Sequence, residues 1–149
     1  MPSLSRSLAA ILTVFWMGGL WVTGLLVAPI LFHELDSATA GRVAGVMFRM
    51  MAWVGMVAGV YLILQSFIEH GFAAFKQTVF WLLLAMLGLT LLNHFLIFPV
   101  IADLKNQLHH AAEGVFGGGF QSWHTLSSLV YLIQALFALV YISRQETRR

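Results

Sequence analysis

The six histidines are the residues of this chain best suited to chemistry, because the chain contains no cysteine. Imidazole nitrogens bind transition metals and haem iron, and they exchange protons near neutral pH. Five of the six fall in one half of the membrane topology that is predicted below: His33, His94, His109, His110 and His124. This one-sided distribution makes them candidates for a ligand site.

His94 and His124 are the candidates for binding haem b or a copper ion, with His109 as a further metal ligand. A helical rise of 1.5 Å per residue places His94 about 6 Å and His124 about 13 Å outward from the middle of their predicted spans. This difference of about 7 Å is awkward for two axial haem ligands, although helix tilts of about 20° are common. A single ion held by His124 and a loop histidine, or a hydrogen-bond chain from His94 to His124 through Asn93 and Ser127, fits these depths better.

Polar residues form a stripe on each of two predicted helices. The first stripe is Thr90, Asn93 and His94, and the second is His124, Ser127, Ser128, Tyr131 and Gln134. Spacings of three and four place each set on one helix face. Because polar groups in lipid must find partners, we expect the two faces to meet inside a bundle as a polar core. Interhelical hydrogen bonds of about 0.6–2 kcal/mol each would then hold the helices in register, and we favour this structural role for the Ser, Thr, Asn and Gln members.

Arg42 and Arg49 are separated by seven positions and share one helical face if a helix includes both. Each guanidinium is suited to binding an anion. The candidate anions are the carboxylates of Glu34 and Asp36, a lipid phosphate and a cofactor carboxylate. We expect an ion pair with one of the two nearby carboxylates.

The composition predicts an all-α integral membrane protein to carry these residues. The chain is 60% hydrophobic and 9% charged, with a mean hydropathy of +0.86, which excludes an ordinary water-soluble domain. Four apolar runs approach the roughly 20 residues that cross a bilayer, and they predict spans over residues 8–32, 48–68, 78–102 and 123–142. The whole chain, residues 1–149, is therefore expected to form one membrane domain, a four-helix bundle with both termini on the same side.

The distribution of basic residues predicts the orientation of this bundle. Five basic residues fall on the side of the termini: Arg6, Lys76, Arg144, Arg148 and Arg149. Three fall on the other side: Arg42, Arg49 and Lys105. This excess favours cytoplasmic termini and places most of the histidines in the outer half. The compact bundle with short loops suggests a bacterial inner membrane, and the net charge of only +2 argues against nucleic acid as a partner.

Two pairs of glycines have the small-xxx-small spacing that allows membrane helices to approach closely. They are Gly55 with Gly59, within the second predicted span, and Gly41 with Gly45, just before it, where that helix would extend outward. We interpret this spacing as a packing face of that helix.

Several motifs, taken in order along the chain, resemble the transmembrane-protein-205-like family of small four-helix membrane proteins, a domain of unknown function. They are Gly18-Gly19-Leu20-Trp21, Ala28-Pro29 with Phe32, Ala40-Gly41-Arg42 with Phe48, Asn93 with Phe98-Pro99, and Trp123-His124 with Ser127. The resemblance covers nearly the whole chain and implies a four-helix membrane bundle without supplying a reaction. More distantly, the layout is similar to copper-resistance protein D and to the HemJ type of protoporphyrinogen oxidase, but no ligand position of either can be transferred to His94 or His124.

Three functions fit these observations. The favoured one is a non-enzymatic accessory or assembly protein that docks another membrane protein or a second copy of itself within the lipid bilayer. The alternative is a haem- or copper-binding protein that uses His94 and His124. The third is a membrane oxidoreductase or small transporter, which would require a charged relay deep in the bundle, and no Asp, Glu, Lys or Arg lies near the middle of any predicted span.

Overall fold

The computed structural model describes the backbone of residues 2–110 and 117–146 and the side chains of residues 4–36, 39–104 and 125–145. The regular elements within these ranges are all helical, which confirms the predicted fold class. Four helical stretches are long and apolar enough to cross a membrane: Leu4–Glu34, Thr39–Lys76, Thr78–Leu104 and Thr125–Gln145. Each overlaps one of the four predicted spans, so the prediction of a four-helix membrane protein is confirmed.

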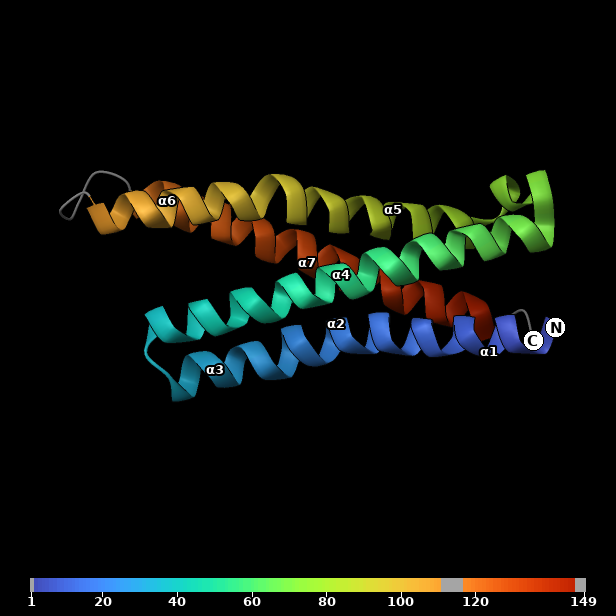
Figure 1. Cartoon of the computed structure of the whole chain (residues 1–149), viewed down its shortest axis with the longest axis horizontal. Helices are drawn as coiled ribbons and strands as arrows, with labels where there is room; N and C mark the ends of the chain where they lie inside the picture. Colours follow the sequence, from blue (N-terminus) through green and yellow to red (C-terminus); the bar gives the residue numbers. More distant parts are fainter. Residues whose placement is uncertain (1, 111–116, 147–149) are drawn as a thin grey trace.

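The first membrane stretch is one continuous rod of α-helical and π-helical segments (Figure 1). It consists of α1 (Pro2–Thr13), a π-helical segment η1 (Val14–Gly18), α2 (Gly19–Trp21), a second π-helical segment η2 (Val22–Val27) and α3 (Ala28–Glu34). A π-helical turn contains one extra residue and rotates the following side chains around the helix axis. The three helices of this rod therefore do not share a single α-helical face.

Two prolines lie inside helical rods without ending them. Pro29 follows η2 by two residues, and Pro99 follows the π-helical segment η4 (Asn93–Ile97) by two residues. Proline lacks an N–H and clashes with the carbonyl four residues before it, and local π-helical adjustments relieve both effects in membrane helices. We infer that the wider π-helical turns allow each helix to continue past its proline.

The second rod starts eleven residues earlier than the sequence indicated. Helix α4 (Ser37–His70) begins at residue 37, whereas the predicted span began at residue 48. The cause is a capping interaction, in which the Asp36 carboxylate accepts a hydrogen bond from the backbone N–H of Thr39 at 3.0 Å. Residues 37–47, which precede the predicted span, are therefore helical and extend the rod beyond its apolar part.

The chain reverses direction after α4 through a 3₁₀ turn, η3 (Gly71–Lys76). Gly71 opens this turn with a φ of 55°, in the left-handed region that favours glycine. The third rod then comprises α5 (Thr78–Leu92), η4 and α6 (Phe98–His110), and the fourth rod is α7 (Gly117–Glu146).

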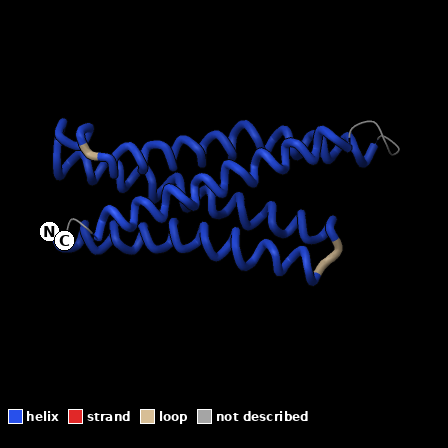
Figure 2. The backbone as a smooth tube through the Cα atoms, turned by 180° about the vertical axis from the view of Figure 1, so that it is seen from behind, coloured by secondary structure: helices blue, strands red, loops and turns tan. Residues whose placement is uncertain are grey.

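The four rods run alternately up and down (Figures 1 and 2). Helix α4 packs against α1, α3 and α5, while α7 packs against α5 and α6. The start of α1 lies at the same end of the bundle as the end of α7 and the turn at η3 (Figure 1). An ion pair between Arg6 and Glu69, with an N–O distance of 3.8 Å, joins α1 to α4 at this end.

The interior of the bundle is built around Trp16, which is completely buried. Its indole lies across the backbone of α4, so that a Cβ added at Gly55 would be 2.5 Å from Trp16 Nε1 and one added at Gly59 would be 3.1 Å from Trp16 Cη2. This pair is therefore the packing face that the glycine spacing predicted. The other pair is not, because no atom of another described rod lies within 4 Å of a Cβ added at Gly41 or Gly45.

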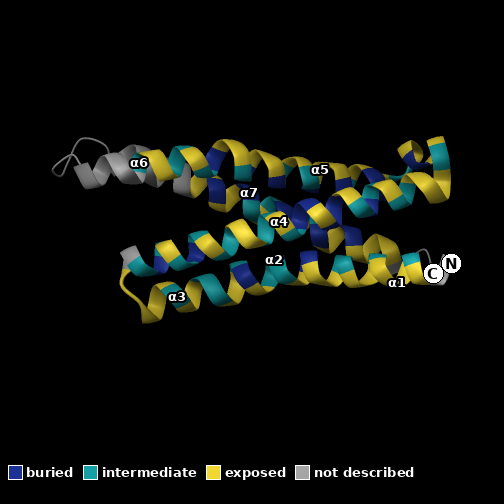
Figure 3. Cartoon of the chain, viewed as in Figure 1, coloured by how far each residue is buried: buried dark blue, intermediate teal, exposed yellow. Residues whose placement is uncertain are grey.

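The buried residues lie mainly where the rods contact one another, whereas many positions that face outward are exposed (Figure 3). Large hydrophobic side chains such as Val14, Phe15, Trp53 and Leu96 are more than half exposed. This distribution is opposite to that of a soluble protein and suits rods that are surrounded by lipid.

Candidate functional site in the polar seam

Five polar residues meet at the contact between the third and fourth rods, and we call this cluster the polar seam. Its members are Thr90, Asn93, Ser127, Tyr131 and Gln134. All except Tyr131, which is half-buried, are buried. Helical spacing places Thr90 and Asn93 on one face of the third rod, and Ser127, Tyr131 and Gln134 on one face of α7, so these members of the predicted stripes face each other, whereas Ser128 is exposed.

Each member of the polar seam has a hydrogen-bond partner in the protein. The Ser127 hydroxyl donates to Asn93 Oδ1 at 2.8 Å, and Gln134 Nε2 donates to Thr90 Oγ1 at 2.6 Å. The Thr90 hydroxyl in turn donates to the carbonyl of Met86 at 2.9 Å. Because lipid offers no hydrogen bonds, these internal partners remove the cost of placing polar groups in the membrane.

Tyr131 connects the polar seam to the first rod. Its hydroxyl donates to the carbonyl of Leu20 at 2.8 Å, and its ring packs edge-on against Phe48 with a centroid distance of 4.9 Å. The ring also lies against Gly24, where a Cβ would collide with it. The side chain of Tyr131, which belongs to the fourth rod, therefore contacts the first and second rods as well.

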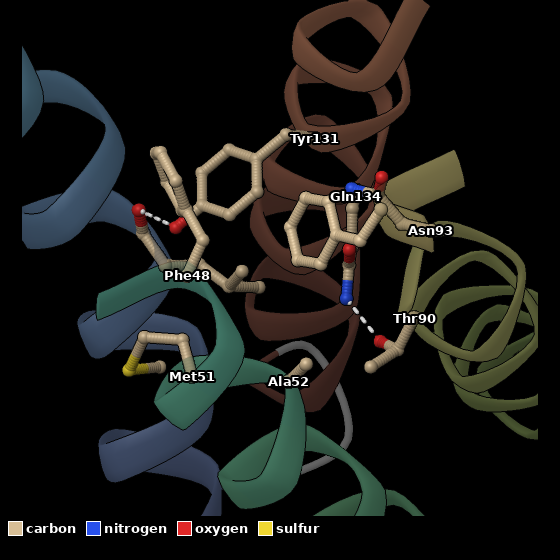
Figure 4. Close-up of a pocket in the computed structure, with 9 residues that line it drawn as sticks. Phe48, Met51, Ala52, Thr90, Asn93, Tyr131 and Gln134 are labelled. Atoms are coloured by element: carbon tan, nitrogen blue, oxygen red, sulfur yellow. Dashed lines mark hydrogen bonds between the residues drawn. The ribbon is translucent and has the colours of Figure 1, made fainter. Parts of the chain in front are cut away.

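The polar seam borders a small cavity of about 20 Å³. Figure 4 shows Thr90, Asn93, Tyr131 and Gln134 along its polar part. Its apolar lining is formed by Leu20, Phe48, Met51, Ala52 and Phe98. A volume of this size holds about one water molecule, whereas small-molecule pockets usually measure about 300–1,000 Å³.

His94 lies outside this cavity, although it follows Asn93 directly in sequence. Successive helical residues are about 100° apart around the axis, and this rotation directs His94 toward α4. Its ring packs against Trp53 and Phe95, with centroid distances of 5.6 and 4.8 Å. Its Nδ1 atom is buried and has no hydrogen-bond partner.

Only part of the predicted histidine chain can be followed in the structure. The Asn93–Ser127 link is formed, but His94 does not join it. The side chains of His109 and His124 lie outside the described residues, as does that of His110. Among the side chains that are described, no group of three or more His, Asp or Glu residues is arranged to hold a metal ion.

The two arginines on α4 differ from expectation in their partners. Both Arg42 and Arg49 are exposed, and within the described side chains neither forms an ion pair. The two carboxylates expected to pair with them are engaged locally: Glu34 binds His33 at 3.0 Å, and Asp36 caps α4. The partners of Glu34 and Asp36 are closer to them in sequence than either arginine is, and the two guanidinium groups remain at the surface.

Sequence reasoning missed Thr23 and Trp53. Thr23 is buried in η2 because the π-helical register turns it inward, and no regular 3.6-residue pattern identifies it. Trp53 packs against His94, a contact between two rods that spacing along either rod alone cannot indicate.

Comparisons with known proteins match this chain to one family. The model of the family described as a domain of unknown function (DUF4149) matches residues 11–110. No curated protein and no solved structure matches the chain. The matched segment includes the first rod from residue 11 onward and the second and third rods, and therefore two of the five members of the polar seam, Thr90 and Asn93.

Proposed function

This chain belongs to the DUF4149 family, and we propose that it is a small accessory or assembly protein of the membrane, acting through its lipid-facing surface. The observation that carries this proposal is how little space the described interior leaves at the polar seam. The polar seam has internal hydrogen-bond partners, and the cavity beside it measures only about 20 Å³. Among the described side chains, the space beside the polar seam holds about one water molecule and is too small for a small-molecule ligand, so we assign the function to the outer surface.

The chemistry of the core also favours a structural role for the polar seam. Amide and hydroxyl side chains form its hydrogen bonds, and none of its five members is an Asp, Glu, Lys or Arg. Interhelical hydrogen bonds of this kind fix helix register. A fixed bundle presents a constant outer surface, which is what a docking partner within the bilayer requires.

The finer parts of the proposal concern placement. We propose cytoplasmic termini, because five Lys and Arg residues lie on that side against three on the other. A bacterial inner membrane suits the compact bundle, and the transmembrane-protein-205-like family remains the proposed closer relationship. The expected partner is another membrane protein or a second copy of this chain, in contact with the lipid bilayer.

Site-specific photo-crosslinking in native membranes tests this function. A benzoylphenylalanine placed at exposed Phe15, Val57, Phe95 or Leu129 should give a discrete protein adduct at positions on one side of the bundle, and reciprocal labelling of the identified partner should return this chain. The same group at buried Leu83 is the matched control and should give none. Lipid adducts alone at every exposed position would contradict the proposal.

A second candidate, haem or copper binding by His94 and His124, is favoured by one observation. His94 Nδ1 is buried without a hydrogen-bond partner among the described residues. A buried nitrogen in this state costs free energy, and a bond to a metal ion would remove that cost. The test is the visible spectrum and metal content of the purified chain beside the His94→Ala and His124→Ala variants. A Soret band or stoichiometric copper that both variants lose would support this candidate over the accessory role.

The third candidate, a membrane oxidoreductase or small transporter, has less support. The polar seam lacks a charged relay, and the cavity beside it does not accommodate more than about one water. We therefore rank it below both others.

A further inference from the structure

The spacing of charged residues along α4 indicates the membrane depth of Arg42 and Arg49. Glu69, paired with Arg6, marks one membrane face. Arg49 precedes it by twenty residues, a helical distance of about 30 Å, which equals the hydrocarbon thickness of a bilayer. The segment between them contains no Asp, Glu, Lys or Arg. Arg49 therefore lies where hydrocarbon meets headgroups on the opposite face, and Arg42 lies about 10 Å farther out, within the headgroup layer.

The geometry of α4 favours an outward direction for both arginine side chains. Helical side chains tilt toward the N-terminus of their helix, which for α4 is the outward direction. Arg49 can therefore extend its guanidinium out of the hydrocarbon, as long basic side chains at helix ends commonly do. Seven positions correspond to nearly two turns, so Arg42 continues the same face.

The partners of the arginines distinguish this pair within the described part of the chain, and Lys76, which also has none there, lies in the turn at the other end of α4. Arg6 pairs with Glu69, and Arg144 has an interaction partner. Arg42 and Arg49 are exposed and have no hydrogen-bond or ion-pair partner among the described residues. An unpaired guanidinium at the edge of the hydrocarbon layer gains the most from an anion that is itself held at that depth.

The surface between Arg49 and the middle of the bundle is apolar and aromatic, which suits the acyl chains of a lipid. Trp53, one turn deeper on the same face, is 56% exposed, and Phe95 on the third rod is 59% exposed. His94 packs against both rings and holds them together. Tryptophan is favoured at the membrane interface because its ring is amphipathic. The acyl chains of a lipid whose phosphate reaches Arg49 would lie over these two rings.

We propose that Arg49 and Arg42 form a binding site for the phosphate of an anionic glycerophospholipid, with Trp53 and Phe95 beneath its acyl chains. The site binds the lipid through charge and depth together. It is independent of the accessory role and of any ligand in the core.

Native mass spectrometry of the purified full chain in detergent tests this site. The chain is titrated with dioleoylphosphatidylglycerol or with dioleoylphosphatidylcholine, whose acyl chains are the same. We expect tighter binding of the anionic lipid, falling about fivefold in Arg42→Gln or Arg49→Gln and about 25-fold in the double variant. Binding of the zwitterionic lipid should not change. Equal affinity for both lipids, or unchanged binding in the double variant, would overturn the proposal.

Arg6→Gln is the matched control, because it removes an exposed arginine from the other face and should leave the preference intact. Sodium phosphate added in excess distinguishes the source of the anion, since displacement of the anionic lipid by it would identify a free-phosphate site and overturn the lipid assignment. If Arg49→Gln does not fold, Arg49→Lys replaces it. Lysine keeps the charge but cannot form the bidentate contact with phosphate, so we expect the affinity for the anionic lipid to fall less than fivefold. If the affinity fell in neither this variant nor Arg42→Gln, the result would count against the site.

Discussion

Ser127 and Asn93 are joined by a 2.8 Å hydrogen bond across 34 positions of sequence and between two different membrane rods. Neither side chain reaches water, so each depends on the other for its polar contact. Gln134 and Thr90, one to two turns deeper, repeat the arrangement at 2.6 Å. The register of α7 against the third rod is therefore fixed by hydrogen bonds at two levels along the bundle.

We expect Gln134→Leu to lower the free energy of unfolding by about 0.6–1.7 kcal/mol, the range found for hydrogen bonds between membrane helices. Thr90→Val removes the other partner. Since both changes break the same bond, the double variant should lose less than the sum of the two single variants. Unfolding in mixed micelles, followed by circular dichroism, measures all four proteins, and strict additivity would show that the bond contributes nothing.

Gly55→Ala should destabilise the bundle by about 1–3 kcal/mol, because its new methyl group would be 2.5 Å from Trp16 Nε1 and the completely buried indole cannot move aside. Gly45→Ala provides the control on the same helix. It meets open space, so it should be neutral or gain up to about 1 kcal/mol from helix propensity. Equal effects of the two substitutions on the unfolding midpoint would argue against the Trp16 contact.

Replacing the imidazole of His94 by Phe should leave the stability unchanged or raise it by about 1 kcal/mol. The substitution removes a buried nitrogen that has no partner and keeps an aromatic ring between Trp53 and Phe95. His94→Ala, which also removes the ring, should destabilise. Thermal unfolding in detergent tests both, and a large loss in His94→Phe would reveal a polar partner of the imidazole.

Tyr131→Phe should cost about 0.5–1.5 kcal/mol, since only the hydrogen bond to the Leu20 carbonyl is lost while the ring remains against Phe48. Tyr131→Leu should cost more, because it also removes the ring. Comparing the two by denaturant titration separates the hydroxyl from the ring. Equal losses would assign the whole effect to packing.

The ion pair between Arg6 and Glu69 should contribute little, although it connects two rods. Both side chains are substantially exposed, at 74% and 39%, and the N–O distance is 3.8 Å. Exposed pairs of this kind contribute about 0–1 kcal/mol, and salt screens them. Glu69→Gln should therefore change the unfolding midpoint only slightly at low salt and not at all in high salt, whereas a loss that persists in high salt would contradict this view.

The features that depend on local pattern could be predicted from the sequence. Composition and the lengths of the apolar runs were enough for four membrane helices, because crossing a hydrocarbon layer requires a certain number of apolar residues whatever their neighbours are. Spacing was also enough to put Thr90 with Asn93, and Ser127 with Tyr131 and Gln134, on facing stripes. The Gly55 and Gly59 pair was identified correctly as a packing face, whereas Gly41 and Gly45, with the same spacing, pack against nothing.

Other features were decided only when the rods came together. Spacing alone grouped His94 with Asn93. The rotation between adjacent helical residues instead brings His94 to Trp53 and Asn93 to Ser127. The sequence pattern of one rod does not give the position of the neighbouring rod. The start of α4 depended on the Asp36 cap, whose carboxylate was expected to pair with an arginine. The amino-acid sequence by itself determined the number of crossings and the polar character of two faces, because these follow from solvation along one helix. The tertiary structure decided which polar groups are paired, how small the core cavity is and which arginines remain free, because each of these depends on distances between rods.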